Sequence, residues 1–218
     1  MAETATYRVK LPSYSLGEEL FNSISHGIGA LLGVAALVVM AVKASSPLAA
    51  TCASVFGVSI IITYTVSCVY HALSPNVAGK RVMRVIDHCG VFLLVFGTYV
   101  PASLLGVGGP LGWALFGVVA TLTVIGIVLS AVDVDRFSKP AVACHLVSGW
   151  SFLAGLPVLY ASCGPACIAL VVGGGVAYSL GAILYGLGRN HTSIHCVFHV
   201  FCLAGTLLQF LAIYLFML

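Results

Sequence analysis

The stretch of residues 88–132 reads HCGVFLLVFGTYVPASLLGVGGPLGWALFGVVATLTVIGIVLSAV and contains no Asp, Glu, Lys or Arg. A helix that crosses a bilayer needs about 20 apolar residues, so this stretch is long enough for two such helices. The run Gly106-Val-Gly-Gly-Pro110 stands near its middle, and Gly and Pro interrupt helices. The stretch therefore predicts two membrane helices that are joined by a tight turn.

The composition of the whole chain agrees with that prediction. Of its 218 residues, 61% are hydrophobic and 7% are charged, whereas a soluble domain usually carries about 25% charged residues. This excludes a soluble globular protein and predicts an all-α integral membrane protein. The net charge of +3 does not indicate a nucleic-acid partner, because the basic residues fall in short segments between apolar runs.

The other uncharged intervals bring the predicted number of membrane helices to seven. Residues 140–188 form a second interval of double length, which Ser162-Cys-Gly-Pro165 interrupts. The intervals 20–42, 44–79 and 190–218 supply one helix each. The predicted spans are residues 21–42, 49–73, 85–106, 111–132, 141–160, 167–187 and 194–217.

Lysine and arginine predict the orientation of these helices, because cytoplasmic loops carry an excess of both. We expect the N-terminus in the cytoplasm and the C-terminus outside. Residues 1–17 then form a short cytoplasmic tail, and residues 18–218 form a single seven-helix domain. The expected cytoplasmic side holds the eight residues Arg8, Lys10, Lys80, Arg81, Arg84, Arg136, Lys139 and Arg189, whereas the other side holds Lys43.

Three histidines near the cytoplasmic side form a candidate metal site. His195 and His199 are four residues apart, a spacing that puts both side chains on one face of a helix. His71 ends the second span and is expected at the same depth. Polar side chains within apolar segments are costly in lipid and usually have a function. Three imidazoles and an open position are typical of a catalytic zinc site, whereas a structural site has four protein ligands.

Two further polar residues are candidates for chemistry beside the three histidines. Asp87 is expected to open the third helix at the same depth and could hold or deprotonate a reacting water. Ser67 lies one helical turn from His71 on the same face and could donate a hydrogen bond to that water or to a reacting oxygen. The segment His195-Cys-Val-Phe-His199 lacks a glutamate after its first histidine, so a general base must come from another helix.

For three other histidines a structural interpretation is preferred. Polar side chains gather at helix ends, where they reach the lipid headgroups, and this accounts for His88 and His191. His145 is more readily explained as a packed or interfacial histidine than as a ligand. Glu19, Asn22 and His26 receive no role from the sequence.

Several motifs resemble those of the hemolysin III family, which belongs with the progestin and adipoQ receptors (PAQR). Residues 19–27 resemble its opening, and the Ser67-x3-His71 element and residues 80–88 with Gly97-Thr-Tyr-Val-Pro101 resemble its next two signatures. The resemblance covers residues 18–218. The closing section of the family is matched by Gly174-Gly-Val-Ala-Tyr178, Gly181, Tyr185 and His195-x3-His199.

The resemblance implies a seven-helix fold that binds zinc near the cytoplasmic side of a bacterial plasma membrane. Its zinc ligands would be His71, His195 and His199, and Asp87 and Ser67 would act beside the metal. The superfamily includes alkaline ceramidases, which implies hydrolase chemistry. Gln209 departs from the pattern, because many bacterial members are expected to have a histidine before Phe210.

Three hypotheses about function follow. The first is a zinc-dependent hydrolase of lipid amide or ester bonds, whose partners are membrane lipids. The second is a receptor or membrane-state sensor in which zinc is structural. The third is a pore or cytolysin, as the family name suggests, although the sequence shows no continuous polar pathway for it.

Overall fold

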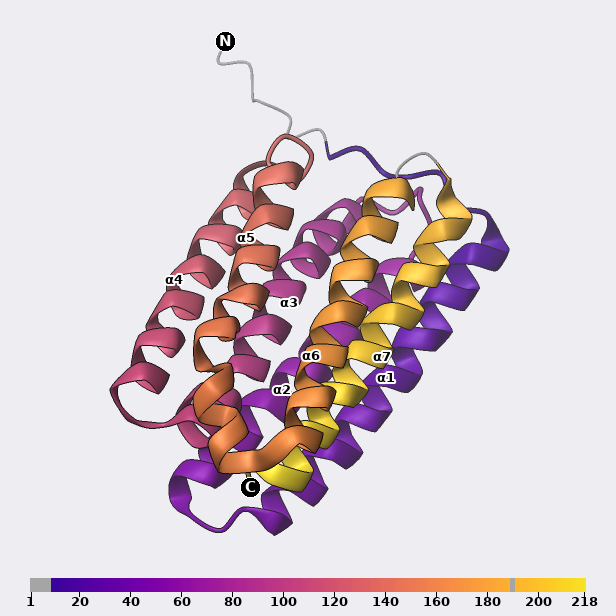
Figure 1. Ribbon diagram of the computed structural model, residues 1–218. Coiled ribbons are helices and arrows are strands. Elements are labelled where there is room, and N and C mark those ends of the chain that lie inside the picture. The colour runs from indigo at the N-terminus through magenta and orange to yellow at the C-terminus, as the bar shows by residue number, and fades with distance from the viewer. Residues whose placement is uncertain (1–8, 189–190) are drawn as a thin grey trace.

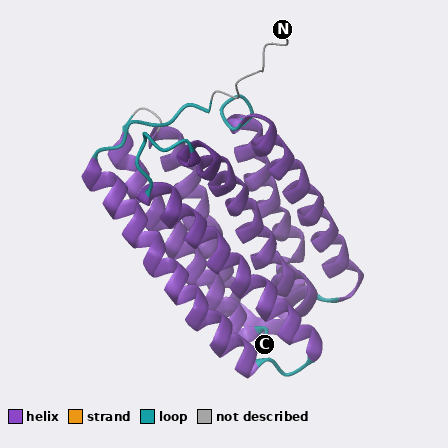
Figure 2. Cartoon of the chain, turned by 180° about the vertical axis from the view of Figure 1, so that it is seen from behind, coloured by secondary structure: helices purple, strands orange, loops and turns teal. Residues whose placement is uncertain are grey.

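The computed structural model describes residues 9–188 and 191–218. Throughout these residues the regular elements are helices, and they lie side by side in one bundle (Figure 1, Figure 2). Six helical stretches are long and apolar enough to cross a membrane. The prediction of an all-α membrane protein is therefore confirmed. The elements are α1 (Leu16–Lys43), α2 (Pro47–Ala72), α3 (Gly79–Pro101), η1 (Ala102–Val107), α4 (Gly109–Asp133), α5 (Ser138–Ser151), η2 (Phe152–Gly155), α6 (Leu156–Gly188) and α7 (Thr192–Phe216).

The first two helices begin at local sequence signals. Ser15 caps α1 in a capping box, in which its hydroxyl accepts from the Glu18 amide and the Glu18 carboxylate accepts from the Ser15 amide. This reciprocal pair satisfies two backbone donors that a helix start leaves free. Ser46 caps α2 through a single hydrogen bond from the Ala49 amide to its hydroxyl, and Pro47 follows as the first residue of the helix, where proline costs no hydrogen bond.

The predicted break between the third and fourth helices lies where the glycines indicated. After α3 the chain continues as the π-helical segment η1 and then turns at Gly108 and Gly109. Both residues have positive φ angles, +65° and +57°, which favour glycine because it has no Cβ. The turn reverses the chain into α4, so the uncharged stretch forms two helices as predicted.

The start of α3 differs from the prediction. The helix begins at Gly79 instead of residue 85, so Lys80 and Arg84 belong to it rather than to a loop. Both side chains are buried, and each is paired with a carboxylate from another segment, Lys80 with Glu19 and Arg84 with Asp135. Counting charges along the sequence could not reveal that these two residues are buried, because their partners Glu19 and Asp135 are distant in sequence.

The stretch Ser138–Gly188 is a single apolar run of 51 residues, but it does not form one straight helix. Gly164 has φ 78° and ψ 177°, and Pro165 follows it, so the helix is interrupted here. In Figure 1 the chain runs along α5, turns at the lower end of the bundle and returns along α6. The interruption coincides with the predicted break at residues 162–165.

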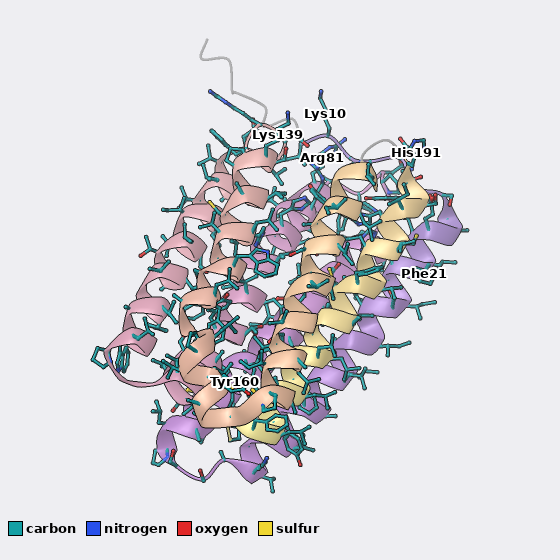
Figure 3. The ribbon with its side chains drawn as sticks, in the orientation of Figure 1. Lys10, Phe21, Arg81, Lys139, Tyr160 and His191 are labelled. Carbon is teal, nitrogen blue, oxygen red and sulfur yellow. The ribbon has the colours of Figure 1, made fainter. Side chains whose placement is uncertain are left out.

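The surface and the ends of the bundle are those of a multi-pass membrane protein. Large apolar side chains are exposed along the helices, including Phe21, which points away from the bundle in Figure 3. The beginning of the described residues, near Lys10, and the C-terminus lie at opposite ends of the bundle (Figure 1, Figure 3). Lys10, Arg81 and Lys139 lie together at one end of the bundle (Figure 3). Arg8 and Arg189, which entered the charge count, lie outside the described residues.

Candidate metal centre

The structure brings the three predicted histidines together inside the bundle. His71 comes from the last turn of α2, and His195 and His199 come from the first two turns of α7. One ring nitrogen of each lies within 4.8 Å of the others. The three side chains are buried, with exposed fractions of 2%, 8% and 1% in chain order.

This arrangement fits a metal ion. The Nε2 atoms of His195 and His199 are 3.2 Å apart. Two nitrogens bound to one tetrahedral zinc at 2.0–2.1 Å would be separated by about 3.3 Å, which is nearly the same distance. His71 Nε2 is buried and has no hydrogen-bond partner among the described residues. A buried ring nitrogen without a partner is costly, and metal coordination would satisfy it.

A carboxylate that the sequence left without a role lies behind His71. Glu19 of α1 accepts a hydrogen bond from His71 Nδ1 at 2.7 Å through one oxygen, and the Lys80 ammonium lies 2.5 Å from its other oxygen. Lys80 is 1% exposed. The only signal in the sequence was the presence of charged residues at the edges of apolar segments, where burial without a partner would be expensive.

The structure places Ser67 and Asp87 next to each other. The Ser67 hydroxyl hydrogen-bonds to the Asp87 carboxylate, and both residues line one cavity with His195 and His199. The neighbouring Arg84 forms its ion pair with Asp135, at 2.9 Å. Asp87 therefore faces the site and is not held by an ion pair to Arg84.

The cavity beside the histidines is mainly apolar. It has a volume of about 210 Å³, and residues from all seven α-helices line it. Its lining includes the apolar residues Phe92, Leu94 and Phe198, together with Asp87, His195 and His199. The cavity therefore places two of the three clustered histidines and a carboxylate beside a mainly apolar space.

Gln209, which departs from the family pattern, reaches the same cavity. Its side-chain amide donates to the Val171 carbonyl at 3.0 Å, so it connects α7 to α6. This contact is structural. The two cluster histidines of α7, His195 and His199, lie closer to the start of that helix.

The remaining histidines differ from the three in the cluster. His88 bonds to the Arg84 carbonyl and to the Tyr185 hydroxyl, and His145 stacks on Phe92 with ring centroids 3.6 Å apart. The packed interpretation of His145 agrees with this geometry. His191 is exposed at the start of α7 (Figure 3). Sequence reasoning missed His26, whose ring stacks on the ring of His199 with their centroids 3.7 Å apart.

The segment before α1 covers one side of the cluster. The Tyr14 ring lies 5.5 Å from His71 and 5.2 Å from His195 between centroids, and burial raises the pKa of Tyr14 above its ordinary value. The Lys10 amide donates to Asp135 at 3.0 Å. Burial raises the pKa of Asp135, but the hydrogen bonds from Arg84 and from this amide outweigh it and hold the pKa below its ordinary value. Asp135 is therefore an ionised anchor for the segment at neutral pH.

The fold and the site together define a multi-pass α-helical membrane protein with a buried three-histidine cluster. The family model described as "Haemolysin-III related" matches residues 14–210. The chain is 33% identical over 205 residues to "Hemolysin-3" of Bacillus cereus, with 92% of each chain covered. It is also 33% identical over 203 residues to "Hemolysin-3 homolog" of Bacillus subtilis (strain 168), covering 92% of this chain and 94% of that one. The protein belongs to the haemolysin-III related family.

Proposed function

We propose that this protein is a zinc-dependent hydrolase that cleaves amide or ester bonds of membrane lipids. The observation that carries the proposal is the position of the histidine cluster. Two of its members, His195 and His199, line a mainly apolar cavity, which the hydrogen-bonded pair Ser67 and Asp87 also lines. A hydrolase for lipids needs both a reactive group and an apolar space beside it.

Each polar residue has a defined task in this proposal. His71, His195 and His199 would hold the zinc ion. When bound, zinc supplies a polarising charge for the substrate carbonyl and lowers the pKa of water to about 7. Asp87 accepts the proton from the attacking water and passes it to the leaving nitrogen or oxygen. Ser67 holds Asp87 in place through the hydrogen bond that joins them.

The shape of the site supports a lipid as the substrate. The apolar walls suit an acyl chain, because a chain that moves from the bilayer into this cavity stays in an apolar environment. The Tyr14 ring lies against His71 and His195. It therefore restricts access of a substrate to the cluster from the side of the segment before α1. The substrate would therefore place its amide or ester carbonyl at the cluster and its hydrocarbon chain in the cavity.

A turnover screen tests this function. Purified protein in vesicles that contain a bacterial lipid extract with added ceramides is incubated with zinc, and lipids are quantified by mass spectrometry. We expect one class of amide or ester lipid to decrease while free fatty acid accumulates. A variant with His195→Ala is the control and should form no product. Equal product from the control and the wild type would contradict the proposal.

The alternative is a receptor or sensor in which zinc is structural. The observation that favours it is that the cluster joins α2 to α7, so that a metal would fix two helices that are distant in sequence. This alternative predicts stoichiometric zinc without turnover. The pore-forming activity suggested by the names of the Bacillus relatives has weaker support, because the cavity walls are mainly apolar.

We also propose seven membrane crossings, with the N-terminus in the cytoplasm and the C-terminus outside. The helical segments before and after Gly164 would each cross the membrane. Lys10, Arg81 and Lys139 cluster at one end of the bundle (Figure 3), which agrees with a cytoplasmic end.

Reporter fusions test this topology. Alkaline phosphatase, which is active only outside the cytoplasm, should be active when fused after Leu218. A fluorescent protein that folds only in the cytoplasm should fluoresce when it is fused before residue 1. A fusion within residues 134–137 serves as the internal control and should read as cytoplasmic. A cytoplasmic reading at Leu218 would overturn the orientation.

A further inference from the structure

The geometry points to Glu19 as the residue that positions His71 for metal binding, with Lys80 as the group that holds Glu19 in place. This inference rests on the proposed function, because it concerns the same metal site. It assigns a role to an α1 carboxylate and an α3 lysine, neither of which is itself among the candidate ligands.

The first step is the contact between Glu19 and His71. The two side chains are 2.7 Å apart between the carboxylate Oε2 and the ring Nδ1, and the imidazole is fully buried. A carboxylate only accepts hydrogen bonds, so Nδ1 must carry the proton. The other ring nitrogen, Nε2, then keeps its lone pair free, and this is the buried atom without a partner in the described residues. Glu19 therefore selects the tautomer and the ring orientation that a metal requires.

The second step is the contact between Lys80 and the other oxygen of Glu19. The Lys80 ammonium lies 2.5 Å from Glu19 Oε1 and donates to the Leu73 carbonyl at 2.7 Å. It also lies over the Tyr70 ring, 5.2 Å from its centroid. The Leu73 carbonyl follows the last turn of α2, where carbonyl groups lack helical donors. Lys80 thereby ties the Glu19 carboxylate to the same end of α2 that carries His71.

The third step is that the network joins three helices at one point. Glu19 belongs to α1, His71 to α2 and Lys80 to α3. Each charged group in it is nearly buried, with side-chain exposures of 12% for Glu19 and 1% for Lys80. Burial of one charge without the other would be strongly unfavourable. The two residues therefore act as a unit, and a test must change them both singly and together.

The test is a comparison of zinc affinity and thermal stability in the full-length protein in detergent. Glu19→Gln alone should lower the Tm of the metal-free protein, because Lys80 loses its counter-charge. The double variant Glu19→Gln/Lys80→Met removes both charges and should regain most of that Tm. Its zinc Kd, measured by competition with a chelator, should nevertheless stay about 10–100-fold above the wild-type value.

Glu18→Gln is the matched control. Glu18 is the neighbouring acidic residue in the first turn of α1, but its side chain bonds to Ser15 and Thr192. This variant should lower the Tm slightly through the lost cap and leave the zinc Kd unchanged. A Co²⁺-loaded sample gives a second readout, because visible absorption bands report ligand geometry. These bands should shift in the double variant and not in Glu18→Gln.

The outcomes separate this inference from the proposed function. A wild-type Kd in the double variant would overturn the positioning role of Glu19 and leave the zinc site intact. Glu19 would then only neutralise the charge of Lys80. A raised Kd with a recovered Tm would support the role. A wild-type protein that binds no zinc would overturn the proposed function, and this inference with it.

Discussion

Alanine at His71, His195 or His199, introduced singly, should abolish the binding of one zinc ion per chain. The three ring nitrogens lie within 4.8 Å of one another, and three ligands are the smallest set that makes a stable catalytic zinc site. Two imidazoles would remain in each variant, which leaves a weak site. Elemental analysis of protein purified after dialysis against a mild chelator measures the loss, and we expect zinc to fall from about one per chain to near zero.

A second histidine variant serves as the control that makes the loss specific. His145 is partly buried and stacks on Phe92, and it lies outside the three-histidine cluster. His145→Gln should therefore keep its zinc, although its stability changes. Full zinc occupancy in all three alanine variants would show that the metal is bound elsewhere, or not by these histidines.

Asp87→Asn should separate metal binding from catalysis. Asparagine keeps the size of the side chain and can still accept the hydrogen bond from Ser67. We therefore expect the zinc content and the Tm to stay near the wild-type values. An amide cannot accept a proton at neutral pH, and loss of a positioned general base typically lowers the rate by about 10²–10⁴-fold. Zinc content, Tm and turnover on the lipid found in the screen should be measured on one preparation.

Two other outcomes are informative for Asp87. A fall in both Tm and zinc content would make Asp87 a structural anchor of α3. The ion pair of Arg84 argues against this, because it is formed with Asp135 and not with Asp87. Unchanged turnover together with unchanged zinc would exclude Asp87 as the base and favour the receptor or sensor.

The sequence was sufficient for the class of fold and for the breaks between helices. Long uncharged intervals can be stable only in lipid, and the glycine and proline runs at residues 106–110 and 162–165 interrupt them where the structure turns. Both are local properties, since hydropathy and backbone freedom depend on the residues themselves. The spacing of His195 and His199 is also local, because four residues make about one helical turn.

The surroundings of the three histidines depended on the tertiary structure. We expected His71 to lie near the histidines of α7 because both were predicted at the same depth in the membrane. In the structure, α2 brings His71 to His195 and His199. Glu19 meets Lys80 across 61 positions, and Arg84 meets Asp135 across 51. Neither pair leaves a local pattern, so Lys80 and Arg84 counted as loop charges until the structure placed them inside α3.

The sequence by itself therefore determined that the protein forms membrane helices, where these helices break, and which histidines share a helix face. Only the tertiary structure decided which charges are buried and which carboxylate stands behind His71. The physical reason is that a membrane helix is stabilised by its own backbone hydrogen bonds and by the lipid around it. A buried charge, in contrast, is stable only when packing brings its partner from another helix.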